Sequence, residues 1–181
     1  MTFETQRLIL RPFEESDAED LYKYASDPDV GLVCGWMPHK NVEESLYIIQ
    51  NVFTNPEAYA LCLKTDNKVI GAIELMLNGN TDSTNRDDEC ELGFWIGKPF
   101  WGQGLMPEAS KEMLRHAFED LGMRTVWCGY HDGNDKSKRV QEKLGFVFHH
   151  TSKNVFVKLT GETITRHINH MTKEQWKSNN I

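Results

Sequence analysis

The segment best suited to chemistry is the glycine turn within Trp101-Gly-Gln-Gly-Leu-Met106, which leads from an alternating apolar strand, residues 89–97, into a helix. Gly102 and Gly104 bracket one residue, and Pro107 follows in the first helical turn, where proline is tolerated. Such a turn leaves several backbone N–H groups unpaired at the positive end of the helix dipole. The spacing therefore predicts a site for a phosphate or pyrophosphate, and with it a phosphorylated cofactor.

The length and composition limit the classes of protein that this chain can be. Its 181 residues suffice for one domain with a full core, and 39% hydrophobic and 26% charged residues fit a soluble globular protein. The sequence has no run of about 18 apolar residues, so we expect no membrane span. The N-terminus lacks the basic-then-apolar order of a signal peptide. We expect one domain over residues 1–181 and a cytoplasmic location.

Charge and cysteine content narrow the expected partners. A net charge of −7 argues against a broad nucleic-acid surface, which needs a basic patch, and mildly favours a cationic partner. The cysteines lie far apart without a C-x-x-C pair, each in or beside an apolar stretch, which is typical of buried reduced thiols. They are Cys34, Cys62, Cys90 and Cys128.

Local signals predict the elements that position the turn. Ser16 with Glu19 reads as a capping box, Asn41 as a helix cap, and Gly122 and Gly145 as helix ends. Strands are predicted over residues 7–12, 59–64, 68–77, 89–97, 124–130 and 146–150, and in a hairpin across 155–171. Helices are predicted over residues 16–26, 42–53, from the glycine turn to 121, 134–144 and 173–177, with loops at 30–40 and 78–88. The order indicates an α/β chain with an antiparallel front half.

Four segments together resemble the GNAT superfamily of acetyl-CoA-dependent N-acyltransferases, and more narrowly its RimJ/RimL-type group of ribosomal-protein N-terminal acetyltransferases. They are Thr5–Phe13, Glu91–Ala109, Asn134–Ser137 and Glu142–Phe146, whose order and spacing match across about residues 3–160. The resemblance implies an α/β (α+β) single-domain fold. It also implies a mixed, mostly antiparallel central sheet with a splayed strand pair, and helices on both faces.

The resemblance also implies acetyl-CoA as the co-substrate and no metal. Main-chain groups of one strand would pair with the pantetheine amides, as an added strand would, and the glycine turn would hold the pyrophosphate. The family turn is Arg/Gln-x-x-Gly-x-Gly/Ala. Here Trp101 takes the Arg/Gln place and Met106 the last place, which removes a polar side chain near the phosphates. The implied cofactor contacts are Phe94, Trp95, Ile96, Gly97, Trp101, Gly102, Gln103, Gly104, Leu105, Met106, Asn134 and Ser137.

Acetyl transfer to an amine requires a base or a proton-relay water, because an aliphatic ammonium is a poor nucleophile. Glu91 is the leading candidate. It shares the Gly93 and Trp95 side of its strand and stands where relatives often carry a glutamate. Glu74, a single acid among apolar neighbours on the preceding strand, is the rival. Either side chain is equally compatible with a surface carboxylate.

The departing thiolate requires a proton donor. Many relatives place a tyrosine seven residues after the helix-opening asparagine, and here that position is Gln141. Ser137 is the alternative, since RimL-like enzymes use a serine there, although a serine in a first helical turn is also an ordinary capping residue. Tyr130 is a weaker candidate. Asn134 is expected to cap the helix and touch the pantetheine.

The histidines and one tryptophan give weaker signals. His149 and His150, adjacent on a strand, should face opposite ways, as should His167 and His170, so no metal site is expected. His131, at a strand end, either reaches the acceptor cleft or is an ordinary loop histidine. In the 30–40 loop, Trp36 either contacts substrate or anchors the loop.

The sequence thus predicts an acetyl-CoA-dependent N-acetyltransferase that transfers acetyl directly to a primary amine of a protein or peptide N-terminus or of a small molecule. The alternative is a non-catalytic acyl-CoA-binding module, suggested by Gln141 in the tyrosine position. A nucleotide-binding protein of Rossmann or P-loop type is disfavoured, because the turn lacks a third glycine and a Gly-Lys-Ser/Thr. The acceptor and the acyl chain length stay open, and a homodimer is neither predicted nor excluded.

Overall fold

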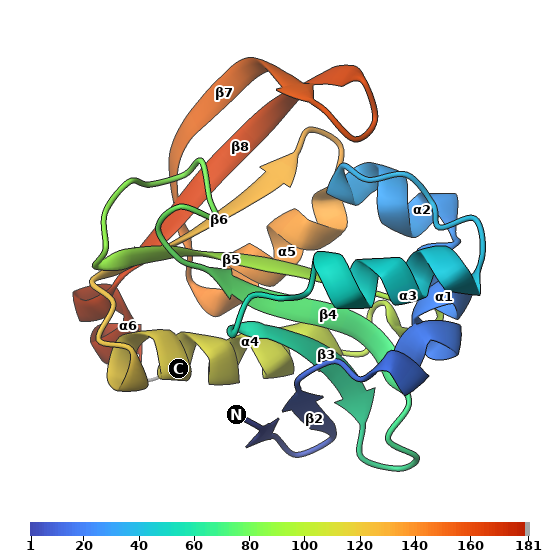
Figure 1. The fold of residues 1–181 in the computed structure, drawn as a ribbon. Helices are drawn as coiled ribbons and strands as arrows, with labels where there is room; N and C mark the ends of the chain where they lie inside the picture. The colour runs from blue at the N-terminus through green and yellow to red at the C-terminus, as the bar shows by residue number, and fades with distance from the viewer. Residues whose placement is uncertain (180–181) are drawn as a thin grey trace. The chain divides into compact units, whose positions relative to one another are not determined.

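Strands and helices alternate along the chain in the computed structural model, which describes residues 1–179 (Figure 1). The strands are β1 (Phe3–Glu4), β2 (Leu8–Arg11), β3 (Ala58–Leu63), β4 (Val69–Met76), β5 (Glu89–Ile96), β6 (Thr125–His131), β7 (Val147–Val157) and β8 (Glu162–Thr172). The helices are α1 (Ala18–Ala25), α2 (Pro28–Gly31), α3 (Val42–Asn51), α4 (Leu105–Arg115), α5 (Asp135–Leu144) and α6 (Lys173–Asn179). Short turns of 3-10 helix are η1 (Glu15–Asp17), η2 (Leu32–Cys34) and η3 (Lys98–Phe100), and η4 (His116–Asp120) is π-helical.

The strands belong to one mixed sheet in the order β1-β2-β3-β4-β5-β6-β8-β7. The pairs β1–β2, β2–β3, β3–β4, β6–β8 and β7–β8 are antiparallel, and β5–β6 is parallel. The predicted fold class, an α/β chain with a mixed and mostly antiparallel sheet, is confirmed.

The chain divides into two compact units. The first comprises residues 1–74 and 94–109, and the second comprises residues 75–93 and the chain from residue 110 onward. Strands β4 and β5 and helix α4 each have residues in both units. The extent of one domain over residues 1–181 stays a prediction.

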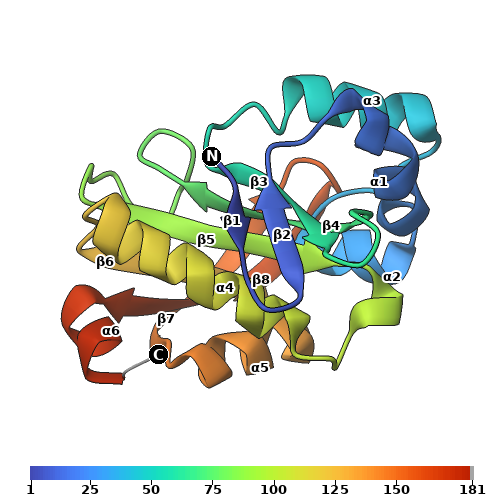
Figure 2. The same ribbon diagram turned by 90° about the horizontal axis from the view of Figure 1, so that it is seen from below.

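The first unit packs α1 against α3, which lie side by side in both views (Figures 1 and 2). Leu21 and Ala25 of α1 bury their side chains with Ile49 of α3, and Trp36 covers the same cluster. Apolar residues three or four apart along each helix produce this shared face, as the helical period requires. The cluster also contains Trp95, so it contacts the strand that carries the expected cofactor-binding residues.

The start of the first long helix differs from the prediction. The capping box uses Glu14 and Asp17, and Ser16 lies inside the 3-10 turn η1, so the predicted Ser16–Glu19 box is wrong. Asp17 also accepts from the Arg11 guanidinium at 2.7 and 2.8 Å. This ion pair with Arg11 of strand β2, six residues earlier, fixes Asp17 at the cap, and the spacing used to predict a capping box does not include it. The cap at Asn41 is confirmed by its bond from the Glu44 N–H at 2.8 Å.

The segment expected to be a loose loop at 30–40 begins with ordered helix. Asp27 accepts a bond from the Asp29 N–H at 2.9 Å, and Pro28 occupies the first helical position of α2. The helix predicted over residues 16–26 ends at Ala25, and Asp27 and Pro28 then start a second helix. A side chain at Gly31 would meet the Trp36 ring at 2.7 Å, so Trp36 packs directly on this helical turn.

In the second unit, β6 pairs with β8, and β8 pairs with β7. The predicted short strand at 146–150 and the first arm of the predicted hairpin are one strand, β7, with irregular register near Phe148 and Ser152. β-Bulges of this kind add a residue to one strand and break the alternation of exposed and buried positions that sequence reading relies on.

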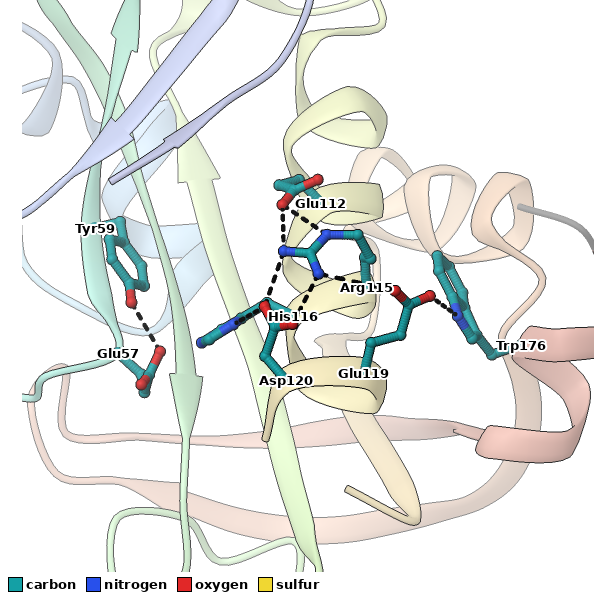
Figure 3. Close-up of polar contacts among 8 residues, drawn as sticks. All are labelled: Glu57, Tyr59, Glu112, Arg115, His116, Glu119, Asp120 and Trp176. Atoms are coloured by element: carbon teal, nitrogen blue, oxygen red, sulfur yellow. Dashed lines mark hydrogen bonds and ion pairs between the residues drawn. The ribbon is translucent and has the colours of Figure 1, made fainter. Parts of the chain in front are cut away.

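The helix after the glycine turn ends in a π-helical turn, in which the Leu121 N–H donates to the His116 carbonyl at 3.0 Å. Arg115 joins Glu112 and Asp120 there, at 2.8 and 2.9 Å (Figure 3). The guanidinium holds the pKa of Asp120 at about 2. Trp176 of α6 stacks on Phe118, so the C-terminal helix is anchored to this turn.

All four cysteines are free thiols. Cys62, Cys90 and Cys128 are buried free thiols, as predicted, and Cys34 is a half-buried free thiol. Burial raises the pKa of the Cys62 and Cys34 thiols to about 12. Within residues 1–179, none of the helices combines the length and the apolar character needed to cross a bilayer.

Candidate functional site

The glycine turn leads into helix α4, as its sequence predicts. Gly102 and Gly104 both have φ of +75°, a left-handed conformation that residues with a Cβ adopt only at a cost. Helix α4 starts directly afterwards, and the Gly104 carbonyl accepts from the Glu108 N–H at 3.2 Å. The N–H groups of residues 104–106 precede that bond and are directed out of the helix end, where an anion binds.

Arg7 is a residue at this turn that sequence reasoning missed. Its N–H and Nε donate to the two carboxylate oxygens of Glu108 at 2.7 Å each, and its Nη1 donates to the Gln103 carbonyl at 3.0 Å. Thr5 donates to Glu108 as well, at 2.6 Å. We call this set the N-terminal clamp: Thr5, Arg7 and Glu108. Figure 2 shows β1 and β2 side by side beside the start of α4.

The clamp places the Arg7 guanidinium, paired with Glu108, at the turn. The Arg7 guanidinium lies 3.7 Å from the position that a Cβ on Gly104 would take, and its side chain is 45% exposed. Trp101, which takes the family's Arg/Gln place, supplies no charge there. The only sequence signal for Arg7 was its place in the family's opening segment, which carries no hint of a contact about 100 residues away.

The two polar side chains within the turn bind the turn itself. The Trp101 indole donates to the Ile96 carbonyl at 2.9 Å, which ties the turn to the end of β5. The Gln103 amide donates to the Pro99 carbonyl at 2.8 Å. Both side chains therefore stabilise the shape of the turn.

Strand β5 carries the residues predicted to pair with pantetheine. The Gly97 N–H donates to the Ile70 carbonyl of β4 at 2.8 Å. Because backbone groups alternate in direction along a strand, Phe94 and Ile96 direct theirs away from β4. The Ile96 carbonyl is engaged by Trp101, which leaves the Ile96 N–H and both backbone groups of Phe94 as candidate partners for an added strand.

The parallel pair β5–β6 has the short ladder expected of a splayed pair. Its register runs from Glu89 opposite Thr125 to Glu91 opposite Trp127. Both strands continue beyond this point, β5 to Ile96 and β6 to His131. Within residues 1–179, pairing between them therefore stops at Glu91.

Glu91 lies where the ladder stops and is only 3% exposed. Its carboxylate accepts hydrogen bonds from the hydroxyls of Thr81 and Ser83 and forms an ion pair with Arg166 of β8. A carboxylate offers about four acceptor positions, so these donors leave about one for a substrate or water. We call these residues the Glu91 network. The rival acid, Glu74, is half-buried on β4 opposite Ala58.

The polar loop at 78–88 binds a second buried carboxylate in the same way. Glu89 accepts from the Thr84 hydroxyl at 2.8 Å and from the Trp127 indole at 2.7 Å. The loop residues Thr81 and Ser83 bind Glu91. The serine and threonine residues of this loop thus have a structural role, because their hydroxyls donate hydrogen bonds to the two buried carboxylates on β5.

His131 ends β6 directly opposite Arg166 of β8. Burial, and secondarily the Arg166 charge, lower the pKa of His131 below its usual range. The His131 carbonyl accepts from the Asn134 N–H at 2.9 Å, so this histidine belongs to the turn that opens α5.

Asn134 caps helix α5 as predicted, because its side chain accepts from the Ser137 N–H at 3.2 Å. The Ser137 hydroxyl accepts from the Gln141 amide at 3.1 Å. Gln141 is fully buried and also binds the Gly129 carbonyl and the Asn169 amide. The tyrosine position of the family thus holds a glutamine that bonds to the candidate acid.

The predicted site residues fall into two groups. Residues 94–97 and 101–106 belong to the first unit, where the turn, β5 and Arg7 come together, whereas Glu91, Asn134 and Ser137 belong to the second. Within the second unit, Ser137 and Gln141 share one hydrogen bond, and Glu91 is bonded to a separate set of partners.

The histidine pair differs from its prediction. His149 and His150 were expected to face opposite ways, but their Nδ1 atoms lie 2.8 Å apart, because the irregular register at Phe148 rotates the strand. His170 contacts the His149 ring, and burial lowers its pKa. Among residues 1–179, three or more histidine, cysteine or acidic side chains do not gather in a geometry that could hold a metal.

Comparison with known proteins assigns the class. Residues 7–147 match the acetyltransferase (GNAT) domain family. The structure of a GNAT-family acetyltransferase from Bacillus anthracis superposes with a TM-score of 0.82 at 20% identity, covering 96% of this chain and 99% of that one. The chain therefore belongs to the GNAT acetyltransferase family, which is a class of acyltransferase enzymes.

Two relatives bear on the narrower group. The "Putative ribosomal N-acetyltransferase YdaF" of Bacillus subtilis (strain 168) is 37% identical over 82 residues, which cover 45% of this chain and 42% of YdaF. The ribosomal-protein-S5-alanine acetyltransferase of Vibrio fischeri superposes with a TM-score of 0.72 at 18% identity, covering 97% of this chain and 98% of that one. These names agree with the predicted RimJ/RimL-like group.

Proposed function

We propose that this protein is an acetyl-CoA-dependent N-acetyltransferase that transfers acetyl directly to a primary amine of a protein or peptide N-terminus or of a small molecule. The observation that best supports the proposal is the left-handed Gly102–Gly104 turn, which opens helix α4. The turn follows strand β5, whose pairing with β6 stops at Glu91. Family membership supports the acyl transfer.

The residues at the turn fit the phosphates of this co-substrate. The amide groups at the start of α4 offer unpaired donors, and Arg7 adds a positive charge. The main chain of Phe94 and the Ile96 N–H would bind the pantetheine amides. When bound, acetyl-CoA supplies an activated thioester carbonyl.

We propose that Glu91 is the base that accepts the proton of the attacking amine, directly or through a water. The proton would bind at the one acceptor position of the carboxylate that Thr81, Ser83 and Arg166 leave open. Glu74 stays the rival. Ser137 would donate a hydrogen bond to the departing sulfur, and Asn134 would orient the helix end that carries Ser137.

Among acceptors, we favour the N-terminal amine of a ribosomal protein, on the strength of the names of the two relatives. Residues 1–181 would form one catalytic domain in the cytoplasm, with no membrane or nucleic-acid partner. A homodimer is a further possibility for sedimentation analysis to decide.

Calorimetric titration with acetyl-CoA tests the proposal first, with dephospho-CoA and free adenosine nucleotides as controls. We expect a Kd near 1 μM, about −8 kcal/mol. Release of free thiol should then follow on mixing with peptides that begin with alanine, the residue in the name of the Vibrio fischeri enzyme. Binding no tighter than that of free nucleotides would refute the proposal. Binding without thiol release from any amine would favour the non-catalytic module.

The role of Glu91 requires a paired comparison, because a change there also breaks the ion pair with Arg166. Glu91→Gln should lower kcat at least 100-fold, about 2.7 kcal/mol. Arg166→Gln, which breaks the same pair but keeps the carboxylate, should lower kcat less than tenfold. If kcat falls equally in both, Glu91 has a structural role, and Glu91→Gln within about threefold of wild type would remove it as the base.

A further inference from the structure

Gln141 is a buried polar side chain for which the proposed function has no role. It is fully buried within α5, and each end of its amide is bonded. Its nitrogen donates to the Gly129 carbonyl at 3.3 Å and to the Ser137 hydroxyl at 3.1 Å, while its oxygen accepts from the Asn169 nitrogen at 2.8 Å. Asn169, on β8, is 6% exposed.

The direction of these bonds is fixed by the chemistry of Gly129. A backbone carbonyl can only accept, so the Gln141 atom beside it must be the amide nitrogen. That nitrogen is also the atom beside Ser137, which makes the serine oxygen the acceptor. The opposite end of the amide is then an oxygen, and it correctly faces a donor, Asn169.

The consequence concerns the hydroxyl hydrogen of Ser137. A serine hydroxyl has one donor hydrogen and two acceptor lone pairs. Because Gln141 occupies an acceptor lone pair, the hydroxyl cannot spend its hydrogen on Gln141. No acceptor for that hydrogen is found among residues 1–179, so it is available to a ligand.

We propose that Gln141, held by Asn169, is a positioning residue that keeps the Ser137 hydroxyl hydrogen directed outward as a donor to the sulfur released in acetyl transfer. The proposal rests on the proposed function. In that reaction the amine nitrogen bonds to the acetyl carbon and the carbon–sulfur bond breaks. Ser137 stabilises the sulfur as it leaves, and the proton lost by the amine completes the free thiol.

A glutamine in the family's tyrosine position is then compatible with catalysis. The amide cannot give up a proton itself, but it orients a neighbour that can donate a hydrogen bond. Bonds arranged in one direction, from Asn169 through Gln141 to Ser137, polarise one another and strengthen the last donor.

Gln141→Glu is the sharpest test, because it keeps the shape and exchanges the donor for an acceptor. An ionised glutamate would accept a hydrogen bond from the Ser137 hydroxyl, which turns its hydrogen inward. Its carboxylate would also face the negative end of the Gly129 carbonyl dipole. We expect kcat for a peptide beginning with alanine to fall about 30-fold, about 2 kcal/mol, with the Kd for acetyl-CoA within threefold of wild type. The ratio of variant to wild-type kcat should rise at low pH, where a protonated glutamate donates again.

Two further variants separate positioning from a loss of stability. In a Ser137→Ala background, Gln141→Glu should change kcat less than twofold, because its target is gone. Leu144→Ala, which weakens the packing of the same helix through a fully buried side chain, should lower Tm but leave kcat within twofold.

A readout without turnover tests the hydrogen bond itself. In the free protein, one Gln141 side-chain N–H should exchange slowly with solvent, and Ser137→Ala should accelerate it. Unchanged exchange, or wild-type kcat in Gln141→Glu while Ser137→Ala is impaired, would overturn the proposal and leave the proposed function intact. Failure of acetyl-CoA to bind the wild type would instead count against the proposed function.

Discussion

A glycine at position 129 makes room for the ion pair that holds Glu91. A Cβ there would overlap the guanidinium of Arg166, whose Nη2 pairs with the Glu91 carboxylate. The far end of an arginine is normally mobile, but this one is held by a buried partner. The cost of adding a methyl group at position 129 therefore measures how rigidly Glu91 holds Arg166.

Gly129→Ala should destabilise the protein by about 1–3 kcal/mol, because the added methyl displaces Arg166 from Glu91. In an Arg166→Ala background the same change should cost less than about 0.5 kcal/mol, since the obstructed group is absent. Urea unfolding of the four proteins in this cycle gives the coupling. Additive costs would mean that Arg166 moves aside freely.

At the scale of elements, the N-terminal clamp joins the turn between β1 and β2 to the first turn of α4. Glu108 accepts hydrogen bonds from Thr5 and Arg7. Burial raises the pKa of Glu108, but these donors lower it further, so the pKa lies below its ordinary value. A carboxylate in the first turn of a helix also complements the helix dipole. The clamp thus holds the glycine turn from its outer side.

Arg7→Ala should raise the Kd for acetyl-CoA about tenfold, about 1.4 kcal/mol, since it removes both a cation and a brace for the turn. Lys64→Ala is the matched control, because it also removes an ion pair near Arg7, that with Glu4, and keeps the bond from the Lys64 N–H to the Arg7 carbonyl. Calorimetric titration of both variants with acetyl-CoA measures the two Kd values. An equal Kd for the two would mean that Arg7 does not act on the phosphates.

The elements could be predicted from sequence where the cause was local. The caps at Asn41 and Asn134 and the left-handed ends at Gly122 and Gly145 were predicted from neighbouring residues. The Ser16 cap was predicted wrongly, because Asp17 is fixed by Arg11 of β2 and bonds the Glu14 N–H in the capping box.

The same division holds in the candidate site. The glycine turn was predicted from its own residues, and the structure has the expected backbone. The partners of Glu91 and Gln141 come from positions as far as 75 residues away, and two of them, Arg166 and Asn169, lie on β8, whose register against β7 is shifted by bulges. No alternation rule predicts such contacts, and the role of Arg7 was hidden for the same reason.

For the molecule as a whole, histidine burial predicts an acid limit to stability. Burial lowers the pKa of His39, His131 and His170 in the folded state. The unfolded chain protonates them near pH 6.5, so below that pH it binds more protons than the folded chain. Stability contributed by the neutral rings is therefore present above pH 6.5 and is lost as the pH falls.

Urea unfolding at pH 7.5 and 5.5 should show a lower free energy of unfolding at the acid pH. His170→Gln should reduce that difference, because it removes one of the three groups. A free energy that rises on acidification would show that other groups dominate the proton balance.

The N-terminal clamp also has a practical consequence for handling the protein. Thr5 and Arg7 both precede β2, so a single proteolytic cut before Leu8 would separate both donors from Glu108. A preparation cut there would lose affinity for its co-substrate with the rest of the chain intact. Mass spectrometry of the peptide that contains Thr5 and Arg7 is therefore a sensible check before any weak titration is interpreted.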